Sequence, residues 1–412
     1  MIAGIDVGSH KVVTLIGEAL PGGGVRVRGI GHAATQGIRA GEVEHIDEAA
    51  GTIATSLERA ERLANDTFDR AFVGITGAHV ESVNNRASLP FARRARAILA
   101  ADVERSLDAA GTVPLPSDRE ILHVLPRGYF VDSGHSVRSP IGMSGCLLAA
   151  DAHLVTVGAA PLATLRRCLE LADVDRFRFV LSTLAAAEAT LTRDERQLGV
   201  AIVDLGHAVT GVASYREGAL AHSATVPIGG RHMTHDLAVF LQASLDQAER
   251  IKKTHGHVLP EHDDGTTNVD VIPFGADAPR PVARHDVSQV LAARADELAD
   301  LIAEELAADG VDGRPPAGVV LVGGGAETRG LARRLHLRWQ LPVRIGRPRD
   351  VAGLATATAG PDHAAAVGLL LWSALGMPDA ANPTGRASAE ANGHGGVFDW
   401  LIGALLPRRP RS

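Results

Sequence analysis

The chain has 412 residues, of which 45% are hydrophobic and 22% are charged, and its formal net charge is -7. This length allows two or more domains with separate hydrophobic cores, and the composition is that of an ordinary globular protein. The acidic balance argues against a general nucleic-acid-binding protein, which would normally carry a basic face.

The first half of the chain is predicted to begin with a β-hairpin whose turn carries the sequence Asp-x-Gly. Apolar strands flank this turn, which runs from Asp6 to Lys11. Residues 83–158 break the rhythm of strands and helices around them, and this indicates an inserted subdomain with its own sheet. The other elements expected here are helices at 47–64, 161–172 and 183–191 and strands at 70–76 and 177–181.

The second half restarts at Leu198 with a similar hairpin, whose Asp-x-Gly turn runs from Asp204 to Thr210. A strand at 318–322 then meets three glycines and Ala326. The apolar stretch 364–375 is expected to be a core helix, because it is too short to span a bilayer. Further expectations are a second insertion at 231–312, helices near 233–241, 244–253, 286–309 and 327–337, and a loop over the Pro-, Gly- and Asp-rich segment 258–284.

The duplicated Asp-x-Gly turn suits a phosphate for a physical reason. Glycine has no Cβ atom, so backbone N–H groups can approach phosphate oxygens closely. Either turn alone is explained by an ordinary hairpin, but two copies in matching positions favour a nucleotide held between two halves. Asp6 and Asp204 would repel phosphate and are expected to hold a hydrated Mg²⁺ instead. The residues expected to face the phosphates are Gly8, Ser9, His10, Lys11, Gly206, His207 and Thr210.

Two further patterns fit a nucleotide between two halves. Gly323, Gly324, Gly325 and Ala326 follow an apolar strand, and glycines there let a ribose or flat ring lie against backbone at a helix N-terminus. A tight turn after a buried strand would give the same pattern. Ala-rich segments at 183–189 and 364–368 would let two helices approach closely and form a hinge, although a generic Ala-rich helix explains them equally well.

Together these motifs resemble the actin-like ATPase superfamily. The turns at 6–11 and 204–210 resemble its first and second phosphate motifs, and Gly323–Ala326 resembles its adenosine motif. Glu249 and Lys252 are similar to the Glu-x-x-Lys helix that approaches ribose and adenine in that superfamily. The resemblance implies a two-lobed, duplicated, ribonuclease H-like α/β fold that binds ATP with Mg²⁺.

Within the superfamily the chain resembles the FtsA family of bacterial cell-division proteins over almost all of 1–376. The stretches 37–41, 73–79, 121–129 and 191–198 carry this likeness, and 83–158 lies where the family has its 1C (SHS2) subdomain. The resemblance implies a peripheral protein on the cytoplasmic side of the cell membrane at the division site. It would form filaments, bind the FtsZ C-terminal peptide, anchor the FtsZ ring and recruit downstream division proteins. The implied divisions are 1–82 (first part of 1A), 83–158 (1C), 159–197 (second part of 1A), 198–230 (first part of 2A), 231–312 (2B), 313–376 (end of 2A and return to 1A), 377–396 (linker) and 397–412 (membrane-targeting helix and basic tail).

The second phosphate motif departs from the superfamily pattern. Many members carry Asp-x-Gly-Gly-Gly-Thr, whereas His207, Ala208 and Val209 replace the inner glycines here. Side chains at these positions should limit how closely the backbone approaches the terminal phosphate. The sequence therefore predicts nucleotide binding with slow or negligible hydrolysis, and no catalytic base is assigned.

The C-terminal segment has the pattern of a membrane-binding helix. The apolar residues follow helical spacing, but ten residues reach only about 15 Å as a helix, so the segment cannot cross a bilayer. The arginines that follow would lie among anionic headgroups. A helix docked on its own domain or on a partner is the alternative. The residues expected at the membrane are Val397, Phe398, Trp400, Leu401, Leu405, Arg408, Arg409 and Arg411.

Two other functions share the same fold. A cytoplasmic adaptor of pilus assembly, similar to PilM, would have the same fold and extra subdomain but no comparable C-terminal anchor. A small-molecule kinase of the superfamily would need a positioned general base and a substrate pocket, and the segment 83–158 shows neither.

Overall fold

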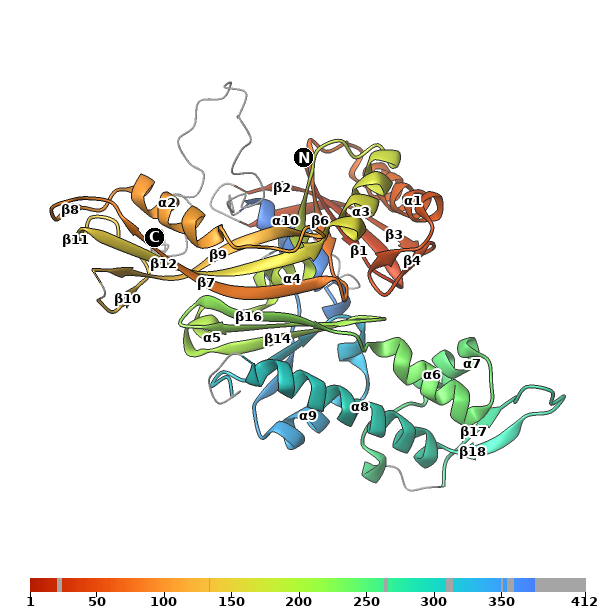
Figure 1. Ribbon diagram of the computed structural model, residues 1–412. Coiled ribbons are helices and arrows are strands. Elements are labelled where there is room, and N and C mark those ends of the chain that lie inside the picture. The colour runs from red at the N-terminus through yellow and green to blue at the C-terminus, as the bar shows by residue number, and fades with distance from the viewer. Residues whose placement is uncertain are drawn as a thin grey trace, which may run out of the picture.

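The computed structural model describes residues 1–20, 24–132, 134–262, 266–308, 314–349, 351–353 and 359–374. In these residues the chain forms two lobes, each built on a mixed β-sheet, and a smaller sheet beside the first lobe (Figure 1). The expected linker at 377–396 and membrane-targeting segment at 397–412 lie outside the described residues.

The first lobe is built on a sheet with the strand order β13-β6-β1-β2-β3-β21. The first three strands of the chain form an antiparallel meander, and β6 and β13 then add to it in parallel on the β1 side. The strands are β1 (Ile2–Val7), β2 (Lys11–Ala19), β3 (Val25–Ala34), β6 (Arg70–Ile75), β13 (Phe177–Leu181) and β21 (Val351–Ala352).

The second lobe repeats this topology. Its sheet has the order β16-β15-β14-β19-β20, which matches β3-β2-β1-β6-β13 strand for strand, antiparallel and parallel pairs included. The strands are β14 (Val200–Leu205), β15 (Thr210–Arg216), β16 (Ala219–Val226), β19 (Val319–Val322) and β20 (Val343–Ile345). The structure thus confirms the duplicated α/β fold that the two Asp-x-Gly turns predict.

Helices cover the sheets and form the junction between the lobes (Figure 1). In the first lobe, α1 (Ile46–Ala64) packs on β3 and against α3 (Ala159–Leu171). Two Ala-rich helices, α4 (Ser182–Thr190) and α10 (Ala364–Ala374), pack against each other. They approach so closely that a Cβ atom on Gly368 would lie 1.7 Å from the Ala185 carbonyl oxygen.

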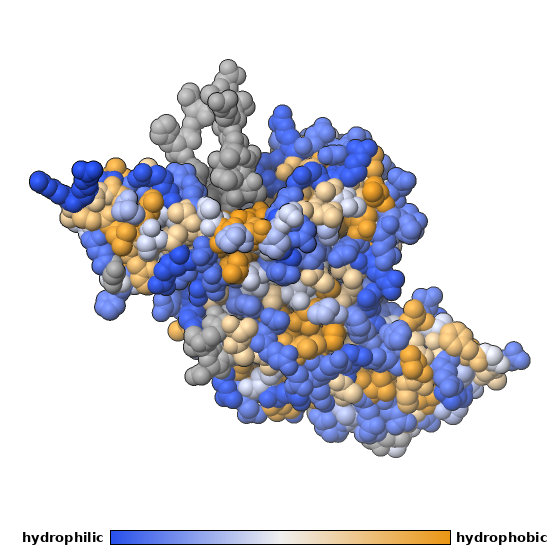
Figure 2. Space-filling model, viewed as in Figure 1, coloured by the Kyte–Doolittle hydropathy of each residue, from blue (hydrophilic) through white to orange (hydrophobic). Residues whose placement is uncertain are grey.

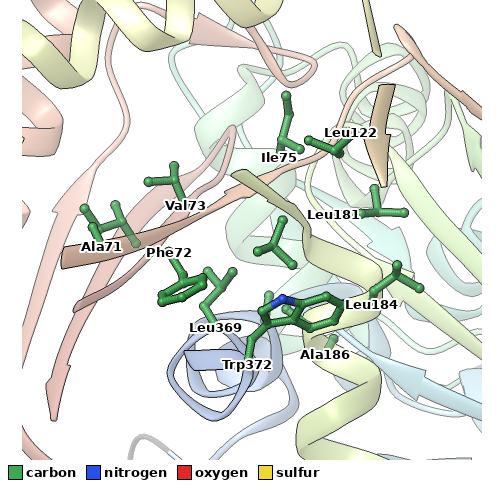
Figure 3. Close-up of a cluster of buried hydrophobic side chains, with 14 of the residues drawn as sticks. Ala71, Phe72, Val73, Ile75, Leu122, Leu181, Leu184, Ala186, Leu369 and Trp372 are labelled. Atoms are coloured by element: carbon green, nitrogen blue, oxygen red, sulfur yellow. The ribbon is translucent and has the colours of Figure 1, made fainter. Parts of the chain in front are cut away.

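Large apolar side chains pack around this contact between small residues. Figure 3 shows Trp372 and Leu369 of α10 beside Leu184 of α4 and Phe72 of β6, all of them buried. Burying a side chain of this size stabilises a fold by about 1.5–3 kcal/mol. The junction therefore holds the first lobe together as well as joining it to the chain that returns from the second lobe.

The insertion between β6 and α3 is a sheet of order β10-β9-β12-β7 that carries α2 (Ala100–Gly111) on one face. Its core contains Ile98, Val103, Tyr129, Leu148 and Leu154. The other face lies against β16 of the second lobe (Figure 1). Its strands are β7 (Val80–Pro90), β8 (Arg96–Ala97), β9 (Arg119–Val131), β10 (Ser136–Val137), β11 (Ser144–Gly145) and β12 (Leu147–Gly158), and β8 pairs with β11 as a separate ribbon.

The second lobe differs from the sequence prediction at two places. The helix expected at 327–337 is divided into a 3₁₀ turn at Gly324–Glu327 and α9 (Leu331–Trp339), because Gly330 adopts φ +86° and interrupts helical geometry. The expected loop at 258–284 contains a hairpin of β17 (Asn268–Val271) and β18 (Arg280–Ala283). The other elements are β4 (Ile38–Arg39), β5 (Glu42–Val43), α5 (Arg193–Leu198), α6 (Gly230–Leu241), α7 (Leu245–Thr254), α8 (Arg284–Ala307) and short 3₁₀ turns at Pro260–His262 and Pro361–His363.

The surface is largely hydrophilic in the view of Figure 2, with hydrophobic patches in the middle of the molecule and over the second lobe, including the region of α6. The exposed apolar residues of this region are Val239, Phe240, Leu245, Ile272 and Phe274. Among the described residues, no helix is both long enough and apolar enough to cross a bilayer.

Candidate functional site

A cavity of about 540 Å³ lies between the two lobes. Both Asp-x-Gly turns line it, together with the glycine-rich segment after β19, the N-terminal end of α6 and the exposed side of α7. This volume lies within the range of small-molecule and cofactor sites in proteins. The residues that line it include Asp6, Gly8, Ser9, His10, Lys11, Ser182, Asp204, Gly206, His207, Glu249, Lys252, Lys253, Gly323, Gly324, Gly325 and Asp362.

The two turns have the same local geometry. The N–H of Gly8 donates to the carbonyl of Lys11 at 3.2 Å, and the N–H of Gly206 donates to the carbonyl of Val209 at 3.1 Å. A Cβ atom on either glycine would lie 2.8 Å from that same carbonyl oxygen. Glycine is therefore required by the close approach of the backbone in both turns, and the two turns line the cavity from opposite lobes.

Each turn is attached to its own lobe by hydrogen bonds. In the first turn, the Thr35 hydroxyl donates to the Gly8 carbonyl at 2.6 Å, and the Gly41 N–H donates to the Ser9 hydroxyl at 2.9 Å. In the second, the first N–H groups of α6 donate to the turn, from Gly230 to the Gly206 carbonyl at 2.9 Å and from Arg231 to the His207 carbonyl at 2.7 Å. The turns are thus fixed before any ligand binds.

Asp6 and Asp204 lie deep in the cavity, one on each lobe. Burial raises the pKa of Asp6 to about 6, although Lys11 and a hydrogen bond from Ser182 oppose the shift. Burial and then repulsion from Asp6 raise the pKa of Asp204 to about 7. Two partly buried carboxylates, of which Asp6 raises the pKa of Asp204, form a site to which a divalent cation is suited.

Lys11 begins a chain of polar contacts behind the first turn. Its ammonium group donates to Asp362 at 2.6 Å, Asp362 contacts His363 Nδ1 at 2.8 Å, and His363 Nε2 lies 3.0 Å from His32 Nε2. Burial alone would raise the pKa of Asp362, but the hydrogen bonds from His363 and Lys11 hold it well below its usual range. Asp362 is therefore ionised and engages Lys11.

A second group of charges lines the cavity on α7. Glu249 pairs with Lys252 at 2.7 Å and with Lys253 at 3.1 Å, and it accepts a hydrogen bond from the Thr234 hydroxyl. Although burial opposes it, hydrogen bonds from Lys252 and Thr234 lower the pKa of Glu249 to about 2. Lys252 also donates to the Gly230 carbonyl at 3.0 Å, so α7 is joined to the N-terminal end of α6.

Most of the residues predicted to bind a nucleotide line the cavity. Glu249 and Lys252, which are far from both turns in the sequence, lie beside them. Thr210 and Ala326 do not line the cavity. Thr210 is fully buried and its hydroxyl donates to the Ile228 carbonyl at 2.6 Å, while Ala326 is fully buried in the core of the second lobe. Neither side chain is placed to contact a ligand there.

Sequence reasoning missed Asp362, Ser182 and Lys253, all of which line the cavity. Asp362 lies 351 positions from Lys11 in the sequence, and no local pattern marks it as its partner. Ser182 follows a buried strand as the first residue of an Ala-rich helix, where a serine is unremarkable in sequence. Lys253 adjoins the predicted Glu-x-x-Lys pattern and could have been included on helical spacing, since it lies four residues after Glu249.

The sequence matches known proteins over most of its length. The profile of the family "Cell division protein FtsA" matches residues 201–368, and that of "SHS2 domain inserted in FTSA" matches residues 77–156. Cell division protein FtsA of Pseudomonas aeruginosa is 36% identical over 90% of this chain and 89% of its own length. The chain belongs to the FtsA family. Family members from Agrobacterium fabrum and Neisseria meningitidis are 34% and 30% identical over 97% of this chain and 94% and 96% of theirs.

Solved structures agree with an actin-like fold. The PilM-PilN type IV pilus biogenesis complex contains a chain that matches with a TM-score of 0.65 at 16% identity, over 90% of this chain and 98% of that one. MreB5 of Spiroplasma citri bound to ADP matches with a TM-score of 0.53 at 14% identity, over 90% of this chain and 95% of that one. At these identities the likeness concerns the fold. The chain is thus a cell-division protein of the FtsA family with an actin-like fold and an SHS2 insertion.

Proposed function

We propose that this FtsA-family chain binds ATP with Mg²⁺ in the cavity between its lobes and assembles into filaments on the inner face of the cytoplasmic membrane. There it anchors the FtsZ ring and recruits downstream division proteins. The observation that carries the nucleotide part is the matched pair of glycine turns, which share one backbone geometry and line one cavity from opposite lobes. Such turns suit the phosphates of a bound nucleotide.

The residues around the cavity fit a nucleotide and its cation. Gly8, Ser9 and Gly206 would contact phosphate oxygens, and Gly323–Gly325 would contact the adenosine end. When bound, Mg²⁺ supplies positive charge that neutralises phosphate. Asp6 and Asp204 would hold it through water, and its positive charge would offset the repulsion between the two carboxylates. MreB5 of Spiroplasma citri shares the fold, and its solved structures include one bound to ADP and one bound to AMPPNP.

Hydrolysis is expected to be slow. The backbone of the second turn is covered by the side chains of His207, Ala208 and Val209, and the latter two are buried. These side chains would limit how closely the backbone of the turn approaches the terminal phosphate and an attacking water. A steady-state ATPase rate of tens per minute from polymerising protein would contradict this proposal.

Isothermal titration of the full chain with ATP and Mg²⁺ tests nucleotide binding. Gly8→Ala places a Cβ atom 2.8 Å from the Lys11 carbonyl oxygen and should weaken binding by about tenfold or more, because the turn must open. Gly51→Ala is the matched control, since its Cβ atom would meet nothing within 4 Å. No heat of binding from the unaltered chain at millimolar ATP would overturn the proposal.

Filament formation on a membrane is tested separately. Electron microscopy of the full chain with ATP on an anionic lipid monolayer should show filaments lying on the lipid. The exposed apolar residues near α6 support a protein–protein contact, because surface patches of this kind commonly mark interfaces. Flotation with anionic liposomes should be lost when residues 396–412 are removed. Dispersed particles in every nucleotide state, or equal flotation of both chains, would count against membrane assembly.

A further inference from the structure

Most cationic groups around the cavity already have carboxylate partners. Lys11 pairs with Asp362 at 2.6 Å, and Lys252 and Lys253 both pair with Glu249. A phosphate that bound these ammonium groups would have to compete with carboxylates that are ionised and partly buried. A phosphate at the tips of the two turns would therefore bind more readily to side chains other than these lysines.

His10 and His207 are such groups. They come from the two turns, one on each lobe, and their rings face each other with centroids 5.1 Å apart and planes inclined by 30°. Within the described part of the chain, the ring nitrogens of His10 and of His207 have no hydrogen-bond partner. The ring nitrogens of His32, His153 and His363, by contrast, do have partners. This contact between the two turns joins the lobes directly at the cavity.

Each of these rings can donate a hydrogen bond near neutral pH. Burial lowers the pKa of His207 to about 4 and lowers that of His10, and the neighbouring cations shift both in the same direction. The charged groups that face the rings are Lys11 of β2, Lys252, Lys253 and Glu249 of α7, and Arg231 of α6. A neutral imidazole keeps one N–H donor, so the pair offers two donors to one acceptor group between the lobes.

We propose, building on the nucleotide function above, that His10 and His207 bind the terminal phosphate of a nucleoside triphosphate from opposite lobes. The third phosphate of a nucleoside triphosphate would be held by both turns and would contact both rings. A nucleoside diphosphate lacks this phosphate and would leave the two rings in contact with each other. The histidine pair thereby makes the closed arrangement of the lobes depend on the third phosphate. Both histidines are positioning residues for binding, and neither is assigned a step in hydrolysis.

The test compares ATP with ADP, each with Mg²⁺, by isothermal titration of the full chain. His10→Ala and His207→Ala should each weaken ATP binding by about tenfold or more, as expected for a lost hydrogen bond to a charged group, and should change ADP binding by less than about twofold. His10→Asn and His207→Asn retain an N–H donor and should recover part of the ATP affinity. His235→Ala, an exposed histidine of α6 outside the cavity, is the matched control and should leave both affinities unchanged.

The outcomes separate this inference from the proposed function. If the unaltered chain binds both nucleotides and the alanine variants keep the same ratio of ATP to ADP affinity, the histidine pair does not bind the third phosphate, although the nucleotide function stands. If the unaltered chain binds neither nucleotide, the proposed function itself fails. Equal losses for ATP and ADP in variants with unchanged melting temperatures would also overturn the role of the pair.

Discussion

One carboxylate beside the cavity occupies a cationic group that a phosphate ligand would need. The Lys11 ammonium group is held by Asp362 at 2.6 Å, and Asp362 is in turn supported by His363. A phosphate anion would have to share or replace this carboxylate. The lysine that the sequence marks as a phosphate contact is therefore restrained by a residue near the other end of the chain.

Replacing Asp362 by Asn should strengthen nucleotide binding. The amide carries no charge, so Lys11 would be free to turn towards phosphate, and we expect ATP affinity to rise by about three- to tenfold, the effect of 0.7–1.4 kcal/mol. Isothermal titration with ATP and Mg²⁺ measures this. Asp236→Asn breaks a similar ion pair, with Arg294 at 2.6 Å, outside the cavity and serves as the control. Unchanged or weaker ATP binding in the Asp362 variant would refute the idea.

At this scale the sequence predicts what depends on local geometry. Gly8 and Gly206 could be identified because the close approach inside a hairpin turn demands glycine, and the requirement is visible within six residues. Thr210 is predicted to face the phosphates, but its side chain is buried at the start of β15, where residues on both faces are buried, and it donates to the Ile228 carbonyl. Asp362 and Ser182 could not be found, because their roles exist only once distant segments meet.

At the scale of elements, the junction of α4 and α10 depends on the absence of side-chain atoms. A Cβ atom on Gly368 would lie 1.7 Å from the Ala185 carbonyl oxygen and 2.2 Å from its carbon, both of them backbone atoms. Small residues predict both helices, but close approach and a generic Ala-rich helix fit the sequence equally well, and the structure shows the close approach. The sequence could not predict the hairpin β17–β18, since each strand has only four residues, only β17 alternates, and turn-forming residues surround both strands.

Gly368→Ala should destabilise the protein by about 2–4 kcal/mol, because one of the two helices must move away from the buried contact. Chemical denaturation followed by circular dichroism measures the loss. Gly51→Ala, in the exposed middle of α1, adds the same methyl group where nothing lies within 4 Å and should stabilise by up to about 1 kcal/mol. Equal stability of the two variants would show that the α4–α10 contact is not tight.

At the scale of the whole molecule, the insertion is joined to both lobes. The chain connects it to the first lobe, and hydrogen bonds connect it to β16 of the second. The Ser82 hydroxyl donates to the Ser223 carbonyl at 2.6 Å, and the Asn84 amide donates to the Ala221 carbonyl at 3.2 Å. His153 lies between them, with Nδ1 2.6 Å from Asn84 Oδ1 and Nε2 2.8 Å from the Ser223 hydroxyl. Any movement between the lobes must therefore act on the insertion.

His153 makes this contact sensitive to acid. Burial, and after it the charges of His222 and Arg127, lower the pKa of His153 to about 3 in the folded protein, while the ordinary value is 6.5. Below pH 6.5 the unfolded chain binds a proton that the folded chain excludes. The contribution of His153 to stability is thus fully present above pH 6.5 and is lost as the pH falls towards 3, by at most about 1.4 kcal/mol per pH unit.

The free energy of unfolding, measured with urea at pH 7, 6 and 5, should fall more steeply in the unaltered chain than in His153→Gln. Glutamine does not titrate, and it keeps an amide that can contact Asn84 or Ser223, so the variant isolates the proton from the loss of the side chain. His235→Gln, on the exposed side of α6, should retain the slope of the unaltered chain.

If His153→Gln retains that slope as well, the proton uptake arises at another buried histidine, such as His123. Burial lowers the pKa of His123 to about 4, and its Nε2 accepts a hydrogen bond from the Leu181 N–H at 3.1 Å. In that case acid would loosen the insertion from the first lobe, through β13, while its contact with β16 of the second lobe stayed intact.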